Sequence, residues 1–256
     1  MRRGRVRTFA RPAVVPLVVL VAWQLIAQAE VVSPVFLPSP KGVVDAGANL
    51  WSSGILGEGL RYTLATALTG WLIASLLGIV LAILITRSRY LVDALAPPLD
   101  FFRSLPAAAV IPSATLVLGF GRSMELSVIV FGAIWPVLLN AVQGILDTEP
   151  QLHEVAHSIQ MSRARRVWSI ELPSTLPAIL LGVRTSLSLA VIIAVVAEMI
   201  ASSGGLGYAL IQASQRFQSG SVYALVLLLG AVGAAANGLV YAVERRILLR
   251  PTGGHS

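Results

Sequence analysis

Long stretches without a single charged residue constrain the fold of this chain more than any other feature. Four examples are residues 62–86, 126–146, 185–197 and 217–243. A helix needs about 20 apolar residues to cross the hydrocarbon core of a bilayer. The whole chain is only 12% charged, against about 25% in a soluble domain. We therefore predict an all-α integral membrane protein.

Six transmembrane helices are expected from the apolar segments of the chain. Their predicted positions are 13–29, 62–86, 105–121, 124–146, 176–200 and 222–246. The third segment is short and carries Pro106 and Pro112. Broken helices survive in a membrane only where other protein or a cavity satisfies the freed backbone groups. We therefore expect the third segment to lie inside the bundle.

The predicted spans divide the chain into an N-terminal tail, a first span, a periplasmic linker, a five-helix core and a C-terminal tail, at residues 1–12, 13–29, 30–61, 62–246 and 247–256. The first span also resembles a cleavable signal peptide, because basic residues precede it and Ala27-Gln28-Ala29 closes it. Its apolar run of about 17 residues exceeds the usual core of about 7–15 residues. An uncleaved span is favoured, and cleavage stays open as the alternative.

The distribution of basic residues predicts the orientation. Fourteen of the 19 fall in one set of loops and tails: Arg2, Arg3, Arg5, Arg7, Arg11, Arg87, Arg89, Arg103, Arg163, Arg165, Arg166, Arg245, Arg246 and Arg250. Lys41, Arg61, Arg122 and Arg216 fall in the opposite loops, and Arg184 lies inside a span. Cytoplasmic loops are enriched in Lys and Arg, so both termini are expected in the cytoplasm. The net charge of +7 then reflects topology and does not indicate nucleic-acid binding.

Two spans carry small residues at every fourth position. One row is Thr66, Gly70, Ala74, Gly78 and Ala82, and the other is Gly230, Ala234, Gly238 and Ala242. Lipid provides no hydrophobic drive for helix association, so close packing of small residues matters in a membrane. Both rows predict helix–helix contacts.

The loop at residues 147–173 is the longest on the predicted cytoplasmic side and is expected to form two short helices. Thr148 can cap the first, with Gln151 three residues later. Its apolar face is formed by Leu152, Val155, Ala156 and Ile159. Ser162 can cap the second, and Pro173 ends it. An exposed short helix with an apolar face needs a partner, either the membrane surface or another protein.

The same loop contains His153-Glu154-Val155-Ala156-His157, which matches the H-E-x-x-H signature of zinc proteases. A catalytic zinc site needs a third protein ligand, and no further histidine follows at the required spacing. We expect no metal and no catalytic residue in this chain. A proton- or sodium-driven transporter is a second alternative, but it usually needs several ionisable residues within its spans.

Several motifs together resemble a known family. They are Phe36-Leu37-Pro38-Ser39-Pro40, Arg103-Ser104-Leu105-Pro106, Ile111-Pro112, Gly119-Phe120-Gly121, Trp135-Pro136 with Asn140 and Gly144, Glu154-Val155-Ala156, Ile170-Glu171-Leu172-Pro173, Ala197-Glu198-Met199 and Gly205-Leu206-Gly207-Tyr208. Their order and spacing are similar to those of permease subunits of bacterial ABC importers of the nitrate, sulfonate, taurine and bicarbonate type. The resemblance covers roughly residues 20–246.

The resemblance implies a type I importer permease of the inner membrane, with a coupling helix at residues 149–160. The residues implied in coupling to a cytoplasmic ATP-binding subunit, present in two copies, are Leu152, Glu154, Val155, Ala156, Ile159, Gln160 and Pro173. No G-x-x-x-x-G-K-[ST] loop occurs in the chain, so this chain is expected to bind no cofactor, with ATP and Mg²⁺ held by the partner. An extracytoplasmic binding protein would deliver a small solute, expected to be a sulfonate- or nitrate-like anion.

One departure from the family pattern concerns Gln160, where the family usually has glycine. Glycine at this position eases a tight turn. An altered loop favours the hypothesis of pairing with a different permease subunit, although a homodimer is preferred.

Glu198 is the acidic residue deep in an apolar run that is expected to have a function. It either faces protein inside the bundle, or it reaches the outer interface and is simply hydrated, or it caps the backbone of the Ser202–Gly207 turn. The resemblance places this turn near a periplasmic gate. The residues expected to form the gate or pathway are Glu198, Gly205, Gly207 and Asn140.

Overall fold

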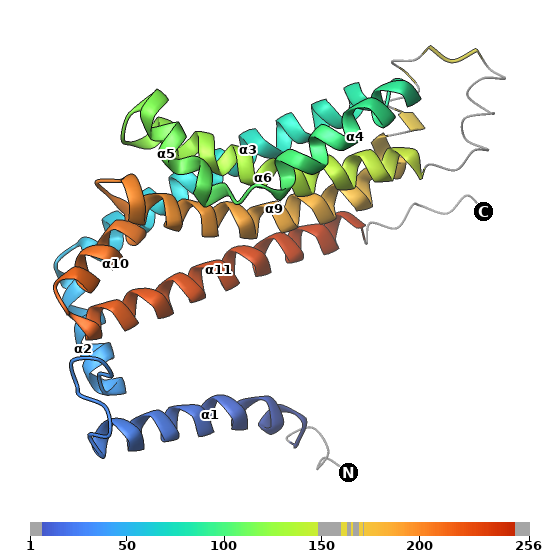
Figure 1. Ribbon diagram of the computed structural model, residues 1–256. Helices are drawn as coiled ribbons and strands as arrows, with labels where there is room; N and C mark the ends of the chain where they lie inside the picture. The colour runs from blue at the N-terminus through green and yellow to red at the C-terminus, as the bar shows by residue number, and fades with distance from the viewer. Residues whose placement is uncertain (1–6, 148–159, 163–164, 166–168, 171, 249–256) are drawn as a thin grey trace, which may run out of the picture.

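The computed structural model describes residues 7–147, 160–162, 165, 169–170 and 172–248. Within these ranges the regular elements are helical, as predicted (Figure 1). The helices are α1 (Arg7–Gln28), α2 (Pro40–Ser52), α3 (Ile55–Ile85), α4 (Arg89–Ser104), α5 (Ala107–Leu118), α6 (Arg122–Leu146), α9 (Leu172–Ala201), α10 (Gly205–Gln215) and α11 (Ser219–Leu248).

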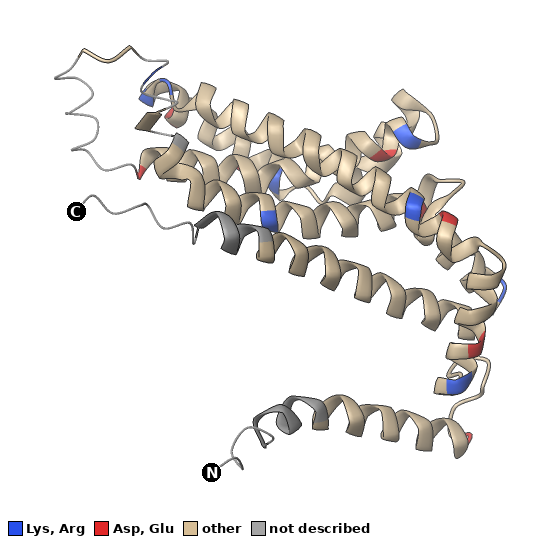
Figure 2. Cartoon of the chain, turned by 180° about the vertical axis from the view of Figure 1, so that it is seen from behind, with Lys and Arg blue, Asp and Glu red and all other residues tan. Residues whose placement is uncertain are grey.

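Four of the described helices, α3, α6, α9 and α11, are long and apolar enough to cross a membrane. If the bent pair of α4 and α5 is counted as one span, the number of candidate spans rises to five. The apolar part of α1, Val14–Gln28, is shorter than these candidates. Charged residues gather at the two ends of the bundle, and few lie along its length (Figure 2). The charged segments of the sequence thus lie at the ends of the bundle, and the charge-free segments form its middle.

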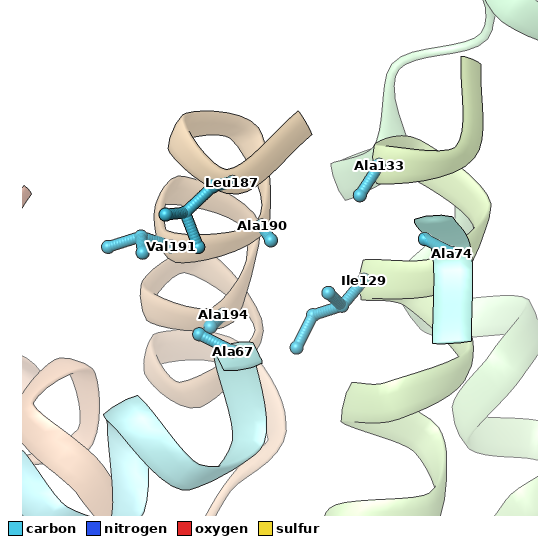
Figure 3. Packing of buried hydrophobic residues seen from close by; sticks show 8 residues of the cluster. All are labelled: Ala67, Ala74, Ile129, Ala133, Leu187, Ala190, Val191 and Ala194. Atoms are coloured by element: carbon cyan, nitrogen blue, oxygen red, sulfur yellow. The ribbon is translucent and has the colours of Figure 1, made fainter. Parts of the chain in front are cut away.

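The helices α3, α6 and α9 form the core of the bundle and all three contact one another. Their central cluster consists largely of alanine with a few branched side chains (Figure 3): Ala67, Ala74, Ile129, Ala133, Leu187, Ala190, Val191 and Ala194. Small side chains let helix backbones approach closely, which is how helices associate in the absence of a hydrophobic drive.

Glycine makes two close contacts between the core helices possible. A Cβ atom added at Gly70 would lie 2.5 Å from Cγ2 of Ile129, and one at Gly182 would lie 2.7 Å from the carbonyl oxygen of Pro136. Neither distance is compatible with a larger side chain. The small-residue row of α3 is buried along its whole length, so its predicted packing role is confirmed.

The corresponding row of α11 behaves differently. Gly230, Ala234, Gly238 and Ala242 are exposed, and a Cβ atom at Gly230 or Gly238 would meet no atom within 4 Å. The prediction that this row packs is therefore wrong for contacts within the described chain. A four-residue spacing places small residues on one side of a helix, but it does not specify what that side faces.

The predicted third span is a broken one. Instead of a single segment at 105–121, α4 and α5 meet at an angle of 89°. Pro106 has no backbone N–H and favours an extended conformation at Leu105, which has φ −71° and ψ 125°. One face of α5 packs against α6 and α9 through Ile111, whereas Leu116 and Val117 are 89% and 82% exposed, so the expected position inside the bundle holds only for part of this helix.

The predicted linker at 30–61 contains regular structure. Helix α2 begins after Ser39, whose Oγ accepts a hydrogen bond from the Gly42 amide at 3.2 Å, with Pro40 in the first turn. Helix α3 starts at Ile55, seven residues before the predicted boundary. Helix α1 stands apart from the bundle (Figure 1), and Trp23 Nε1 ties its end to the Pro38 carbonyl at 3.0 Å.

Candidate functional site

The carboxylate of Glu198 organises a buried polar cluster where α9 ends. Glu198 is fully buried. Its Oε2 atom accepts hydrogen bonds from the Thr63 hydroxyl of α3 and from the Gly207 amide of α10, each at 2.9 Å. The Thr63 hydroxyl oxygen in turn accepts the Leu206 amide at 2.9 Å. These four residues, which we call the Glu198 clasp, join α3, α9 and the start of α10.

Two of the three expectations for Glu198 agree with the structure. The side chain faces protein, and it also accepts a hydrogen bond from the Gly207 amide of the Ser202–Gly207 turn. The expectation of a hydrated side chain at the interface is wrong, because Glu198 is fully buried. A buried carboxylate is costly unless it is hydrogen-bonded, and the clasp provides two donors.

The clasp requires glycine on both sides of Leu206. Gly205 has φ +93°, and a Cβ atom there would lie 2.3 Å from the carboxyl carbon of Glu198. At Gly207 an added Cβ atom would lie 2.3 Å from the Val195 carbonyl oxygen. The carboxylate can reach the amides only because these side chains are absent. The structure thus brings together Glu198, Gly205 and Gly207, three of the four predicted gate or pathway residues.

Asn140 lies elsewhere. Its amide donates to the Pro136 carbonyl of the same helix at 2.8 Å, and it packs beside Gly182 of α9. Glu125 lies in the first turn of α6, and Asn140 is 15 residues further along the same helix. This separation corresponds to about 22 Å. Asn140 therefore lies apart from the gate glycines, and its assignment to the pathway stays a prediction. Its local role is to bond the backbone one turn earlier.

A second buried carboxylate, Glu125, was missed from the sequence. It lies in the first turn of α6, is fully buried, and its Oε1 accepts the Tyr62 hydroxyl at 3.2 Å. An acidic residue in the first turn of a helix is ordinary because it complements the helix dipole, so its position gave no reason to single it out. Tyr62 and Thr63 are neighbours on α3, and they bind the two carboxylates separately.

An open cavity of about 910 Å³ lies beside the clasp. Gly204 and Gly205 line it, and so does Tyr62. Three arginines, Arg61, Arg122 and Arg216, also line it, with Glu58 as the acidic residue. No described acidic side chain makes an ion pair within 4 Å of these arginines. The cavity therefore presents guanidinium groups available to an anion.

The predicted coupling residues fall mostly outside the described residues. This applies to Leu152, Glu154, Val155, Ala156 and Ile159, and to the whole H-E-x-x-H match. Pro173 is described and lies in the first turn of α9, where proline is tolerated. The described residues contain no group of three or more potential metal ligands.

Two observations bear on the loop around Gln160. Its φ is +49°, which is the left-handed region that favours glycine. Ser162 Oγ accepts a hydrogen bond from the Arg165 amide at 3.4 Å, as expected of the residue predicted to cap the second short helix. The position where the family usually has glycine therefore adopts a glycine-like conformation with glutamine.

Comparisons with known proteins agree on one family. The model of the binding-protein-dependent transport system inner membrane component matches residues 74–249. The chain is 34% identical to a putative aliphatic sulfonates transport permease of Bacillus subtilis, with 91% of this chain and 84% of that protein covered. It is 27% identical to the taurine transport system permease of Escherichia coli, with 90% and 86% covered.

Solved structures show the same fold. A chain of the MetNI methionine ABC transporter in an inward-facing conformation matches with a TM-score of 0.65 and 18% identity, covering 74% of this chain and 94% of that one. An amino acid ABC transporter matches with a TM-score of 0.63. Neither the zinc-protease nor the secondary-transporter alternative finds support in these matches. The chain belongs to the family of binding-protein-dependent transport system inner membrane components, and it is a multi-pass permease subunit of an ABC importer in the inner membrane.

Proposed function

We propose that this permease conducts a small organic oxyanion of the sulfonate type and that the Glu198 clasp closes the extracytoplasmic end of its pathway. The observation that carries this proposal is the clasp lying beside a cavity with three arginines that lack acidic partners among the described residues. Guanidinium groups bind planar and tetrahedral oxyanions through paired N–H donors. The names of the relatives, which refer to aliphatic sulfonates and taurine, support this substrate class.

The proposal places the α10 end of the bundle outside and both termini in the cytoplasm. Arg103 must be removed from the count of cytoplasmic residues, because it ends α4 at the break instead of lying in a loop. The remaining basic residues still strongly favour the opposite end, where Arg87 and Arg89 lie. An extracytoplasmic binding protein then delivers its ligand at the cavity.

Energy comes from a partner in this proposal. The sequence has no phosphate-binding loop, so two copies of a cytoplasmic ATP-binding subunit hold ATP and Mg²⁺. Residues 149–160 dock into them through the apolar face that includes Val155 and Ala156. Two copies of this permease form the pathway, and a heterodimer with a different permease is the alternative. A single permease species in the mass of the intact complex supports the homodimer.

Orientation is tested by cysteine labelling, because the chain has no cysteine of its own. Ser203→Cys places a thiol in the cavity, and Ser88→Cys places one at the opposite end; both serines are exposed. In intact cells a membrane-impermeant maleimide should label the first and should label the second only after permeabilisation. The reverse pattern would contradict the orientation.

Transport is tested in proteoliposomes that contain the permease, its ATP-binding subunit and its binding protein. Radiolabelled ethanesulfonate should accumulate when ATP is supplied to the coupling side. Replacing Ala156 by Glu on the expected apolar face should abolish uptake and detach the ATP-binding subunit, whereas His157→Glu, which helical spacing places on the polar side of the expected helix, should not. Uptake by the Ala156→Glu variant would refute the docking assignment.

A further inference from the structure

The break between α4 and α5 opens into a cavity of about 320 Å³. Helix α4 starts at Arg89, so Arg103 lies 14 residues along it, or about 21 Å by helical rise. On the other side of the cavity is Gly132 of α6, which is about 15 Å from the start of that helix at Arg122. The cavity therefore lies partway through the membrane, away from both ends of the bundle.

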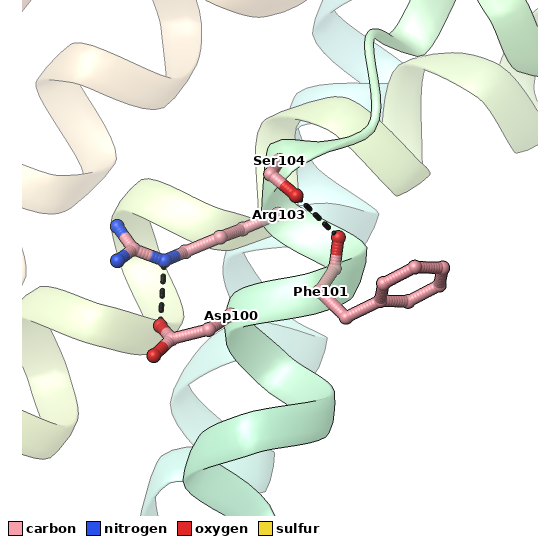
Figure 4. A network of polar contacts seen from close by, with 4 residues as sticks. All are labelled: Asp100, Phe101, Arg103 and Ser104. Carbon is pink, nitrogen blue, oxygen red and sulfur yellow. Dashed lines mark hydrogen bonds and ion pairs between the residues drawn. The ribbon is translucent and has the colours of Figure 1, made fainter.

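Arg103 supplies a charge at this depth. Its Nε atom donates to Asp100 Oδ1 at 2.8 Å, which holds the guanidinium beside α4 (Figure 4). The two terminal nitrogens make no hydrogen bond to a described residue, and the side chain is half-exposed. Ionisable side chains are expensive inside a membrane and usually mark the route of an ion or substrate.

The first backbone amides of α5 are further donors around the cavity. Trp135 lines it with its ring, whereas its indole nitrogen is buried and is not a donor at the cavity surface. Ala107 and Ala108 line it too, and their amides are the first of α5, which have no acceptor within the helix. No acidic residue lines the cavity. A cavity with free donors and no carboxylate favours an anion, as in transporters whose interrupted helices point their amino ends at a substrate.

The rest of the wall is aliphatic. Leu189, Ile192, Ile193 and Val196 of α9 line it, and they offer no hydrogen bond to a polar ligand. The volume is at the lower end of the range for small-molecule sites. The lining thus combines a polar side for a charged head with an apolar side for a short hydrocarbon tail.

We infer that the cavity at the α4–α5 break, with Arg103 and Trp135, is a second anion site that binds the oxyanion head of a short aliphatic acid halfway along the transport pathway. The inference rests on the proposed function for its substrate class, because the relatives alone do not place a binding site in the permease. Asp100 is a positioning residue, since it holds the guanidinium without lining the cavity.

The test measures equilibrium binding of radiolabelled ethanesulfonate to the purified full-length permease in lipid nanodiscs. Arg103→Gln should weaken binding at least about tenfold, the usual effect of losing a hydrogen bond to a charged group. Trp135→Ala, which removes the aromatic part of the wall, should weaken it by a smaller factor. Arg89→Gln is the matched control, because Arg89 forms a similar exposed pair with Asp93 on the same helix and should bind as the wild type does.

A second measurement needs no variant. Unlabelled ethanesulfonate should compete for the site in the wild-type permease, and the neutral ethanesulfonamide should not. Equal competition by both, unchanged binding in Arg103→Gln, or no binding to the wild-type permease would each overturn the inference. Ethanesulfonate uptake by the complete importer with an unaltered rate in Arg103→Gln would overturn the site alone, whereas failure of the wild-type importer to transport any of ethanesulfonate, sulfate or nitrate would overturn the proposed function.

Discussion

The hydroxyl of Thr63 stands between the Leu206 amide and the carboxylate of Glu198, accepting a hydrogen bond from the first and donating one to the second, both at 2.9 Å. It therefore connects the first turn of α10 to the end of α9 through a side chain of α3. A hydroxyl can do this because it is a donor and an acceptor at once.

Replacing Thr63 by valine keeps the shape of the side chain and removes both hydrogen bonds. Leu206 loses its acceptor and Glu198 loses one of its donors in a buried environment, which costs about 1–3 kcal/mol for each unsatisfied group. We expect a clear fall in the thermal unfolding temperature of the purified permease, and ATP hydrolysis that no longer depends on the binding protein in the complete importer.

Thr63→Ser should retain both properties, because the hydroxyl remains. Thr69→Val is the control on the same helix, since Thr69 is exposed and only bonds the Ala65 carbonyl of its own helix. If Thr63→Val and Thr69→Val unfold at the same temperature, the clasp does not stabilise this end of the bundle.

Alanine substitutions at Gly205 and Gly54 distinguish the cost of backbone strain from the cost of a steric clash. Both have positive φ, at +93° and +81°, but a Cβ atom at Gly54 meets nothing within 4 Å, whereas one at Gly205 meets the Glu198 carboxylate. Gly54→Ala should cost about 1 kcal/mol of stability from the left-handed conformation alone. Gly205→Ala should cost more and should also impair ethanesulfonate uptake.

Chemical unfolding of both variants, together with uptake in proteoliposomes, measures the two effects. Equal losses of stability would mean that the carboxylate moves aside without cost, and the assignment of Gly205 to the gate would then be wrong.

Alanine substitutions in the two small-residue rows should have opposite effects on stability. Gly70→Ala forces a methyl group against Ile129 and should destabilise the permease by about 1–3 kcal/mol, as overpacking usually does. Gly238→Ala meets open space and should leave stability unchanged or raise it slightly, since alanine is the better helix former. Thermal unfolding of the purified protein compares them directly. A similar loss in Gly238→Ala would show that the α11 row is packed after all.

The conformation of Gln160 predicts how substitutions at this position change the affinity of the permease for its ATP-binding subunit. Its φ of +49° costs an ordinary side chain about 1 kcal/mol, which glycine avoids and asparagine tolerates better than most residues. Affinity of the permease for its ATP-binding subunit should therefore be at least as high in Gln160→Gly and Gln160→Asn as in the wild type, and lower in Gln160→Val, whose branched side chain suits this region least. A tighter complex with valine would show that the loop leaves the left-handed conformation when it docks.

The parts of this structure that could be predicted from the sequence are those where one local pattern had one physical meaning. The longest charge-free runs could only be spans, and Glu198 stood out because it lies deep in an apolar run. Glu125 escaped notice because an acid in a first turn has an ordinary explanation. Helix α4 escaped because Asp93, Asp100 and Arg103 gave it the charge of a surface helix, although it pairs with α5 across the break.

The two rows of small residues show the remaining limit. Both have the same spacing in the sequence, yet Gly70 is pressed against Ile129 and Gly238 meets nothing. Which neighbour a helix face receives depends on how distant segments are arranged, and the periodicity of one helix carries no information about that. For the same reason the three arginines of the large cavity, which lie far apart in the chain, could not be grouped in advance.

Because α4 and α5 meet at nearly a right angle, rotation of α4 about its own axis would be converted into a sideways movement of α5. A straight helix that turns about its axis moves nothing beyond its own side chains, but here the turning of α4 would swing α5 through an arc. Helix α5 has 12 residues, so its arm is about 18 Å long, and a twist of about 10° in α4 would move its tip by about 3 Å. A small rotation near Arg89 would therefore become a displacement of about 3 Å at the far end of α5.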